Sequence, residues 1–88
     1  MTFGSSPRRY GFSIRWREEL VCACEAGAFA LDMPGHTEVL VPPESAWVQR
    51  VPPWARGDRD AFVAQLGAWC RSGGHTLTVW DQAPVYDA

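Results

Sequence analysis

The sequence predicts an α+β domain in which one amphipathic helix covers one face of a mostly antiparallel sheet of about five strands. Three observations support this class. Residues 11–41 contain four short segments in which successive side chains fall on the two faces of an extended strand, with turn-forming residues between the segments. Residues 57–72 carry apolar side chains at helical spacing, and residues 75–80 alternate again. The expected order is therefore a four-stranded meander, a helix and a closing strand.

The four N-terminal segments are short enough to be strands joined by tight turns. Residues 11–17, GFSIRWR, alternate apolar with polar side chains and form the clearest strand. The segments 20–26 and 28–33 follow, on either side of Gly27. The fourth segment, TEVLV at 37–41, follows a Pro-Gly turn and is ended by two prolines. Consecutive strands with such turns are typical of an antiparallel meander.

The helix over 57–72 has both a buried stripe and signals at its ends. Gly57 or Asp58 can cap its N-terminus, and Gly73-Gly74 supplies a left-handed stop. The apolar stripe consists of Phe62, Val63, Leu66, Trp69 and Cys70. One such helix covers only one face of the sheet. The other face must be solvated, capped by Trp side chains or used by a partner.

The closing strand, HTLTVW at 75–80, returns the chain to the sheet, and a parallel pairing with the fourth strand would require a right-handed crossover. We expect residues 1–10 to form a flexible tail, because Gly, Ser and Pro precede two arginines there. Residues 11–82 then form a single domain, and residues 83–88 an irregular C-terminal tail.

The length and net charge of the chain limit the functions that it can have. A chain of 88 residues forms one small core with little room for a deep cleft. Its net charge of −2 gives no field that would attract phosphate backbones, so nucleic acid is a poor candidate partner. The sequence has neither a secretory leader nor an apolar run of membrane-spanning length. We therefore expect a soluble, cytoplasmic protein that binds no membrane.

No motif for a nucleophile, an acid–base pair or a cofactor is present, so we expect no catalytic residue, no cofactor and no enzyme activity. The thiols of Cys22, Cys24 and Cys70, with His75, could be imagined as a zinc site. The first two lie in an apolar alternation without the usual ligand spacing. Buried, reduced thiols are the favoured interpretation, and no metal is expected.

The segment 47–60, WVQRVPPWARGDRD, crowds tryptophan, proline and arginine together. One interpretation is structural, with Trp47 and Trp54 folded back over the end of the core. The other is functional, since exposed Trp and Arg are enriched at binding hot spots. Both can hold, with Trp47 inward and Trp54 outward. The candidate partner-binding residues are Trp47, Arg50, Trp54 and Arg56.

From Ala28 to Trp80 the order of elements resembles the small α+β immunity proteins of bacterial polymorphic-toxin and contact-dependent inhibition systems. The resemblance consists of Trp47 followed by Pro52 and Pro53, then the helix DRDAFVAQLGAWCRSGG and the strand HTLTVW. It covers a little over half of the chain, and residues 11–17 lie outside it. The resemblance implies a non-enzymatic protein that binds one cognate toxin and blocks its active site.

The leading hypothesis is therefore a protein-binding module, an immunity protein that neutralises a basic toxin through acidic rims and a Trp/Arg patch. An alternative is a self-associating domain that pairs edge strands or its open sheet face into a homodimer. A small enzyme or metal protein using Cys24, Cys70 and His75 is a third class. A toxin-like neighbouring gene, a concentration-dependent mass and bound zinc would distinguish the three.

Overall fold

The computed structural model describes residues 8–15 and 18–88, and it confirms the α+β class. A four-stranded antiparallel sheet has the strand order β1-β2-β3-β6. A separate two-stranded parallel sheet pairs β4 with β5. The strands are β1 (Gly11–Arg15), β2 (Glu19–Cys24), β3 (Gly27–Asp32), β4 (Glu38–Val41), β5 (Thr76–Val79) and β6 (Val85–Asp87). The helices are α1 (Glu44–Arg50) and α2 (Arg59–Gly73), with 3₁₀ turns at Pro34–His36 and Pro53–Ala55.

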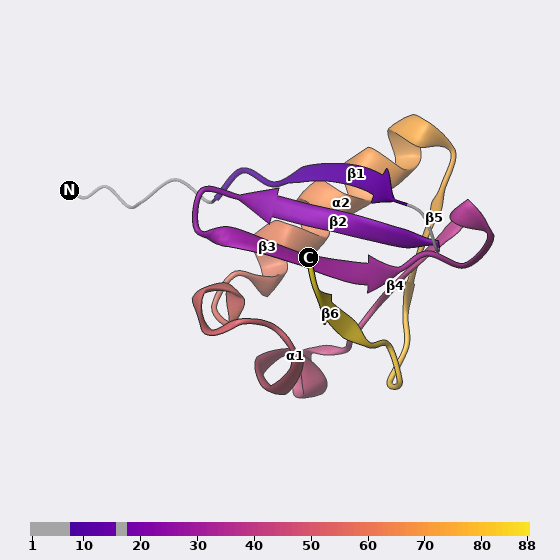
Figure 1. Ribbon diagram of the computed structural model, residues 1–88. Helices are drawn as coiled ribbons and strands as arrows, with labels where there is room; N and C mark the ends of the chain where they lie inside the picture. The colour runs from indigo at the N-terminus through magenta and orange to yellow at the C-terminus, as the bar shows by residue number, and fades with distance from the viewer. Residues whose placement is uncertain (1–7, 16–17) are drawn as a thin grey trace.

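The register of the larger sheet sorts its side chains onto two faces. Cys22 lies opposite Phe29, and Leu20 lies opposite Leu31, so these four share one face, where all are buried. Buried residues of α1 and α2 complete this core, and α2 crosses behind the sheet in Figure 1. No helix covers the front of the sheet in that view. The expectation of one covered and one open face is therefore met.

Helix α2 forms where the periodicity predicts it. Its buried residues are Phe62, Leu66 and Cys70, while Val63 and Trp69 pack against the core from its flanks. Asp58 is the N-cap residue, and Gly74 ends the helix in the left-handed conformation at φ 77°. The conformational freedom of glycine thus allows the chain to reverse directly into β5.

The expected four-stranded meander is wrong in its fourth strand. Strand β4 leaves the sheet of β1–β3 and pairs in parallel with β5, with Glu38 opposite Thr76 and Val41 opposite Val79. The cause is the turn before it, in which Gly35 and His36 both have positive φ, 65° and 57°. The 3₁₀ turn carries the chain out of the sheet. The parallel pairing that the sequence left open does occur.

Two segments expected to be irregular have regular structure. The proline-rich connection contains α1, which begins after Pro43 and buries Trp47. The C-terminal tail contains β6, whose Val85 lies opposite Leu31 and which completes one edge of the sheet. Ala83, just before it, is fully buried. The domain therefore extends past residue 82, and the expected irregular tail at 83–88 is corrected.

The expected flexible tail at 1–10 is also too long. Tyr10 is only 9% exposed and belongs to the core, and its backbone N–H donates to Gln65 Oε1 at 2.8 Å. Arg8 makes contacts described below. Residues 1–7 of the expected tail, and Trp16 and Arg17 of the expected first strand, lie outside the described residues.

Candidate partner-binding surface

Trp47 belongs to the core, so the structure corrects its place among the partner-binding residues. Its side chain is 1% exposed, and its ring contacts those of Phe29 and Phe62 at centroid distances of 6.0 and 5.2 Å. The indole Nε1–H donates to the carbonyl oxygen of Ala55 at 3.0 Å. This bond satisfies the one polar group that burial would otherwise leave unpaired. A side chain in this position has no surface to offer a partner.

Trp54 is half-buried and is packed rather than directed outward. Its ring stacks on Tyr10 at 6.4 Å and contacts Phe29 at 5.9 Å. The guanidinium of Arg8 lies 5.8 Å from the ring centroid, a cation–π distance. Gly27 approaches so closely that a Cβ there would lie 3.0 Å from Trp54 Nε1. The ring is therefore enclosed by the β2–β3 turn, the core and an arginine.

Asp58 joins the N-terminal segment to the start of α2. Its carboxylate accepts from Arg8 at 2.8 Å and from the Tyr10 hydroxyl at 3.1 Å. It makes no side-chain capping bond, because these donors occupy it. Burial, reinforced by the negative charge of Asp58, raises the pKa of Tyr10 above its ordinary value. Arg8 also pairs with Glu25 at 3.0 Å and donates to the Trp54 carbonyl at 3.1 Å.

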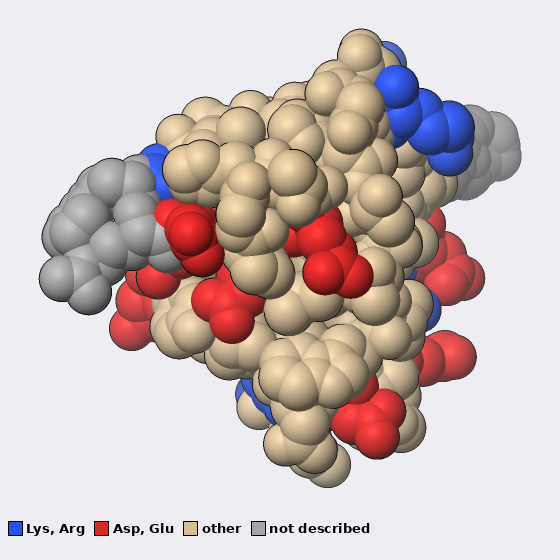
Figure 2. Space-filling view, turned by 90° about the vertical axis from the view of Figure 1, so that its right-hand side faces the viewer, with Lys and Arg blue, Asp and Glu red and all other residues tan. Residues whose placement is uncertain are grey.

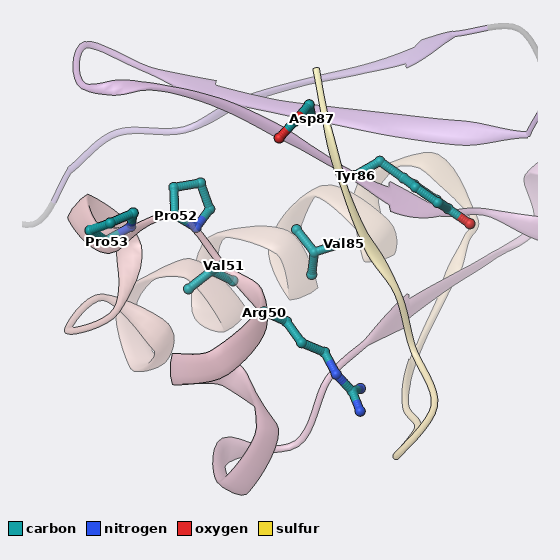
Figure 3. A pocket seen from close by; sticks show the side chains of 7 residues that line it. All are labelled: Arg50, Val51, Pro52, Pro53, Val85, Tyr86 and Asp87. Carbon is teal, nitrogen blue, oxygen red and sulfur yellow. The ribbon is translucent and has the colours of Figure 1, made fainter.

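Arg50 has a structural role at the end of α1. Its guanidinium donates to the carbonyl oxygens of Asp81 and Ala83 at 2.6 and 3.0 Å and so fixes the turn between β5 and β6. Beside it lies an open groove of about 270 Å³ between residues 50–53 and residues 85–87. Figure 3 shows Arg50 at one wall and β6 at the other, with Val85 and Tyr86 leaving the strand on opposite sides.

Arg56 is exposed, as the hypothesis required, but the candidate that shares its groove is Trp47, which is buried. Arg56 lines a second shallow groove of about 220 Å³ beside Glu44, Val48 and Asp60. Of the four candidate residues, one is buried, one is enclosed and one is tied to two carbonyls. The structure therefore does not bring them together as a Trp/Arg patch.

The open face of the four-stranded sheet is a different surface, to which the sequence pattern assigns no partner-binding residue. The register places Ser13, Val21, Ala30 and Tyr86 in one row across the four strands. A second row contains Ala23 opposite Ala28. Most of these side chains are small, but Ala30 is fully buried, so a partner would contact the more exposed side chains around it, such as Ser13. Tyr86 is the largest of them and is 38% exposed.

One end of this open face is acidic. Glu19 and Asp32 lie directly opposite each other on β2 and β3, although like charges in such a pair destabilise a sheet. Arg15, the next residue in the row, pairs with Glu19 at 2.7 Å and donates to the Asp87 carbonyl at 3.3 Å. Partial burial, with a hydrogen bond to Asp32 and the charges of Asp32 and Glu19, raises the pKa of Tyr86. Asp32 has no basic partner among the described residues.

More carboxylates surround this end of the sheet. Glu18 is exposed and has a positive φ of 60°, an uncommon conformation for a residue other than glycine. Its carbonyl oxygen accepts the Met33 N–H at 2.7 Å, which holds the β3 terminus beside it. Glu38 begins β4 and accepts the Thr78 hydroxyl at 2.6 Å. Figure 2 shows the side of the molecule on the right of Figure 1, where acidic side chains are spread over an uncharged surface and basic ones lie near its margins.

The cysteines are free thiols. Cys22 and Cys70 are buried and Cys24 is half-buried, as expected for thiols that help to fill a core. Burial raises the pKa of Cys22 and of Cys70, so both keep their protons at neutral pH. Residues 8–15 and 18–88 contain no group of three or more His, Cys, Asp or Glu side chains placed to hold a metal ion. His75 instead stacks on Trp69 at 4.8 Å.

Comparison with known proteins adds no family to this description. No protein-family model matches the chain, and neither curated proteins nor solved structures provide a match. Within the described part of the chain, neither α-helix combines the length and apolar composition needed to cross a bilayer. The function of this chain is therefore inferred from its own surface.

Proposed function

We propose that this chain is a non-enzymatic protein-binding module that holds a basic protein against the acidic end of its open sheet face. An immunity protein that neutralises a cognate toxin is the specific form of the proposal, in line with the resemblance in element order. The observation that carries it is the pair Glu19 and Asp32, two carboxylates opposite each other, of which Arg15 pairs with Glu19 alone in the described part of the chain.

The like-charged pair supports binding because it costs stability in the free protein. A partner cation placed beside Asp32 would relieve the repulsion, and the interaction would be strongest in the complex. The left-handed Glu18 adds to this argument, since a strained backbone position persists only where other interactions hold it and such positions collect at functional sites. A partner bearing Arg or Lys fits this surface.

The remainder of the open face favours a protein partner over a small-molecule ligand. Its described side chains are small and spread across four strands, whereas small-molecule sites are concave and bury most of their ligand. Tyr86 stands at its edge with an exposed ring, and Tyr is well suited to contacts that are apolar on one side and polar on the other. A broad protein surface would cover these features together.

The test is capture followed by quantitative binding. The tagged chain is used to isolate proteins from a lysate of its own organism, and any stoichiometric partner is produced separately. We expect a basic protein whose activity or toxicity falls to zero at a ratio of one to one. Binding should weaken as the salt concentration rises, because complementary charge steers association. A captured protein that retains its full activity in the complex would contradict the neutralising role.

Matched variants locate the surface. Asp32→Asn removes one charge of the pair without changing its shape, and we expect affinity to fall at least about tenfold. Asp60→Asn is the control, because Asp60 lies on the first turn of α2 and not on the sheet. Equal affinity of the two variants would place the partner elsewhere on the molecule.

A further inference from the structure

The outer edge of β5 carries free hydrogen-bonding groups. Thr76 N–H donates to the Thr37 carbonyl and Trp80 N–H to the Val41 carbonyl, both at 2.9 Å. Alternate residues of a strand face the same neighbour, so Thr76, Thr78 and Trp80 face β4. The N–H and C=O groups of Leu77 and Val79 therefore point to the other side. Within residues 8–15 and 18–88, no strand pairs with that edge.

This edge lacks the features that usually prevent strand pairing. Natural edge strands are protected by charges, prolines or bulges, and the segment His75–Trp80 contains no carboxylate, lysine or arginine and no proline. The edge strands of the larger sheet differ, since β1 contains Arg15 and β6 contains Asp87. Val79 is 52% exposed and Trp80 is 45% exposed. The unprotected edge is thus accompanied by exposed apolar side chains.

We propose that β5 is a self-complementary edge through which two copies of this chain pair in an antiparallel manner about a twofold axis at Thr78. In this register Leu77 of each copy lies opposite Val79 of the other. Both residues exchange N–H and C=O bonds, and every outward-pointing group is satisfied. Thr78 then meets Thr78 across the axis, and Trp80 lies opposite Thr76. Such Thr–Thr and aromatic–β-branched pairs stabilise sheets.

Other registers are poorer. A shift by one residue would set Leu77 opposite Thr78, whose backbone groups face β4. A shift by two in one direction would set Val79 opposite His75, whose N–H already donates to the Cys70 carbonyl at 2.8 Å. In the other direction it would set Leu77 opposite Asp81, whose carbonyl already accepts from Arg50 at 2.6 Å. Only the register centred on Thr78 uses both outward residues of both strands.

A second copy is the favoured occupant because the edge complements itself in hydrogen bonding and in charge. The strand is uncharged, so two copies meet there without repulsion between like charges. The pairing is short, however, and stable interfaces bury about 1,200 to 2,000 Å² in total. We therefore expect a weak dimer, with a Kd on the order of 10 μM or above. The proposal is independent of the acidic surface on the larger sheet.

The first test is mass as a function of concentration, by sedimentation velocity between about 1 and 500 μM. We expect a shift from monomer to dimer across this range. Val79→Lys places a charge on the edge and should weaken association at least about tenfold. Val48→Lys is the matched control, because Val48 is an equally exposed valine on α1, and it should dimerise like the wild type. A wild type that remains monomeric, or a Val79→Lys variant that dimerises normally, would overturn the proposal.

The second test is covalent and does not depend on affinity. Residues in a non-hydrogen-bonded antiparallel pair have Cα atoms about 4.5 Å apart, within the range that a disulfide can bridge. Thr78→Cys should therefore give a reducible dimer under mild oxidation. Thr76→Cys should not, since Thr76 faces Trp80 in this register. Equal cross-linking of the two variants, or none with Thr78→Cys, would show that the twofold axis does not lie at Thr78.

Discussion

The tryptophans of the proline-rich corner and the tryptophan at the end of β5 have similar sequence surroundings and opposite environments. Trp47 lies a few residues before Pro52 and Pro53, Trp54 lies directly after them, and Trp80 lies shortly before Pro84. Yet Trp47 is 1% exposed and Trp80 is 45% exposed. The Trp47 ring packs against rings from β3 and α2, whereas Trp80 follows β5 at the start of the turn to β6. The number of converging elements, rather than local composition, decides whether a tryptophan stabilises the fold or remains available for contact.

The largest effect should come from Trp47→Ala. Removing this ring leaves a cavity between α1, β3 and α2, and comparable truncations cost about 3 to 5 kcal/mol. Urea unfolding measures the change, with Val48→Ala on the same helix as the control that stays within about 0.5 kcal/mol. A loss below about 1 kcal/mol for Trp47→Ala would contradict the buried position of this ring.

Trp54→Ala should have a smaller effect, of about 2 kcal/mol, because the ring is half-buried and some of its surface is already in water. The variant also removes the aromatic ring over which the Arg8 guanidinium lies. Urea unfolding of Trp54→Ala and Arg8→Ala, alone and together, gives their coupling energy. Strict additivity would show that the Arg8–Trp54 contact contributes nothing.

Alkaline pH should destabilise the domain through two weakly acidic groups in the core, the thiol of Cys22 and the hydroxyl of Tyr10. The pKa of Cys22 is raised above its ordinary 9.0 by burial, and that of Tyr10 is raised above 10.0. Above pH 9 the unfolded chain loses these protons while the folded chain keeps them. Stability is therefore complete below pH 9 and falls as pH rises, by up to about 1.4 kcal/mol per pH unit for each group. Urea midpoints from pH 7 to 10.5 measure the slope, and a Tyr10→Phe variant should show a shallower one above pH 10.

The smallest effect on stability should come from Trp80→Ala, within about 0.5 kcal/mol. The ring is 45% exposed and is not one of the buried core residues, so its removal leaves the core nearly unchanged. The same variant should weaken self-association at β5, so its sedimentation and its urea midpoint respond differently. A destabilisation near that of Trp47→Ala would remove the distinction between the two regions.

The fold could be predicted where side-chain periodicity is strong. The alternation in β2, β3 and β5 and the helical stripe of α2 are local patterns, and their positions are within a few residues of the expectation. Helix α1 was missed because its seven residues bury only Trp47, too few to establish a period. Strand β6 was missed because three residues after a proline give no measurable alternation. The place of β4 depends on the positive φ of His36 in the preceding turn and on the long-range pairing with β5, and neither is visible in local periodicity.

The candidate surface could be predicted only in part. Alternation correctly implied an open sheet face, but the register was needed to show that Glu19 meets Asp32. The Trp/Arg segment was misleading, because the same residue types fill cores and form hot spots. Arg8 could not be connected to Trp54 or Asp58 from sequence, since these partners lie 46 and 50 residues away along the chain.

The pairing of β6 with β3 has a consequence for the order in which the molecule folds. Hairpins β1–β2 and β2–β3 join neighbouring segments and close at little entropic cost, whereas Phe29 meets Asp87 only after almost the whole chain has been arranged. The β4–β5 pairing likewise awaits α2. During synthesis, the meander can form first, but one edge of its sheet stays unpaired until residues 85–87 leave the ribosome. The nascent chain would therefore expose the free edge of β3 to its neighbours until residues 85–87 pair with it.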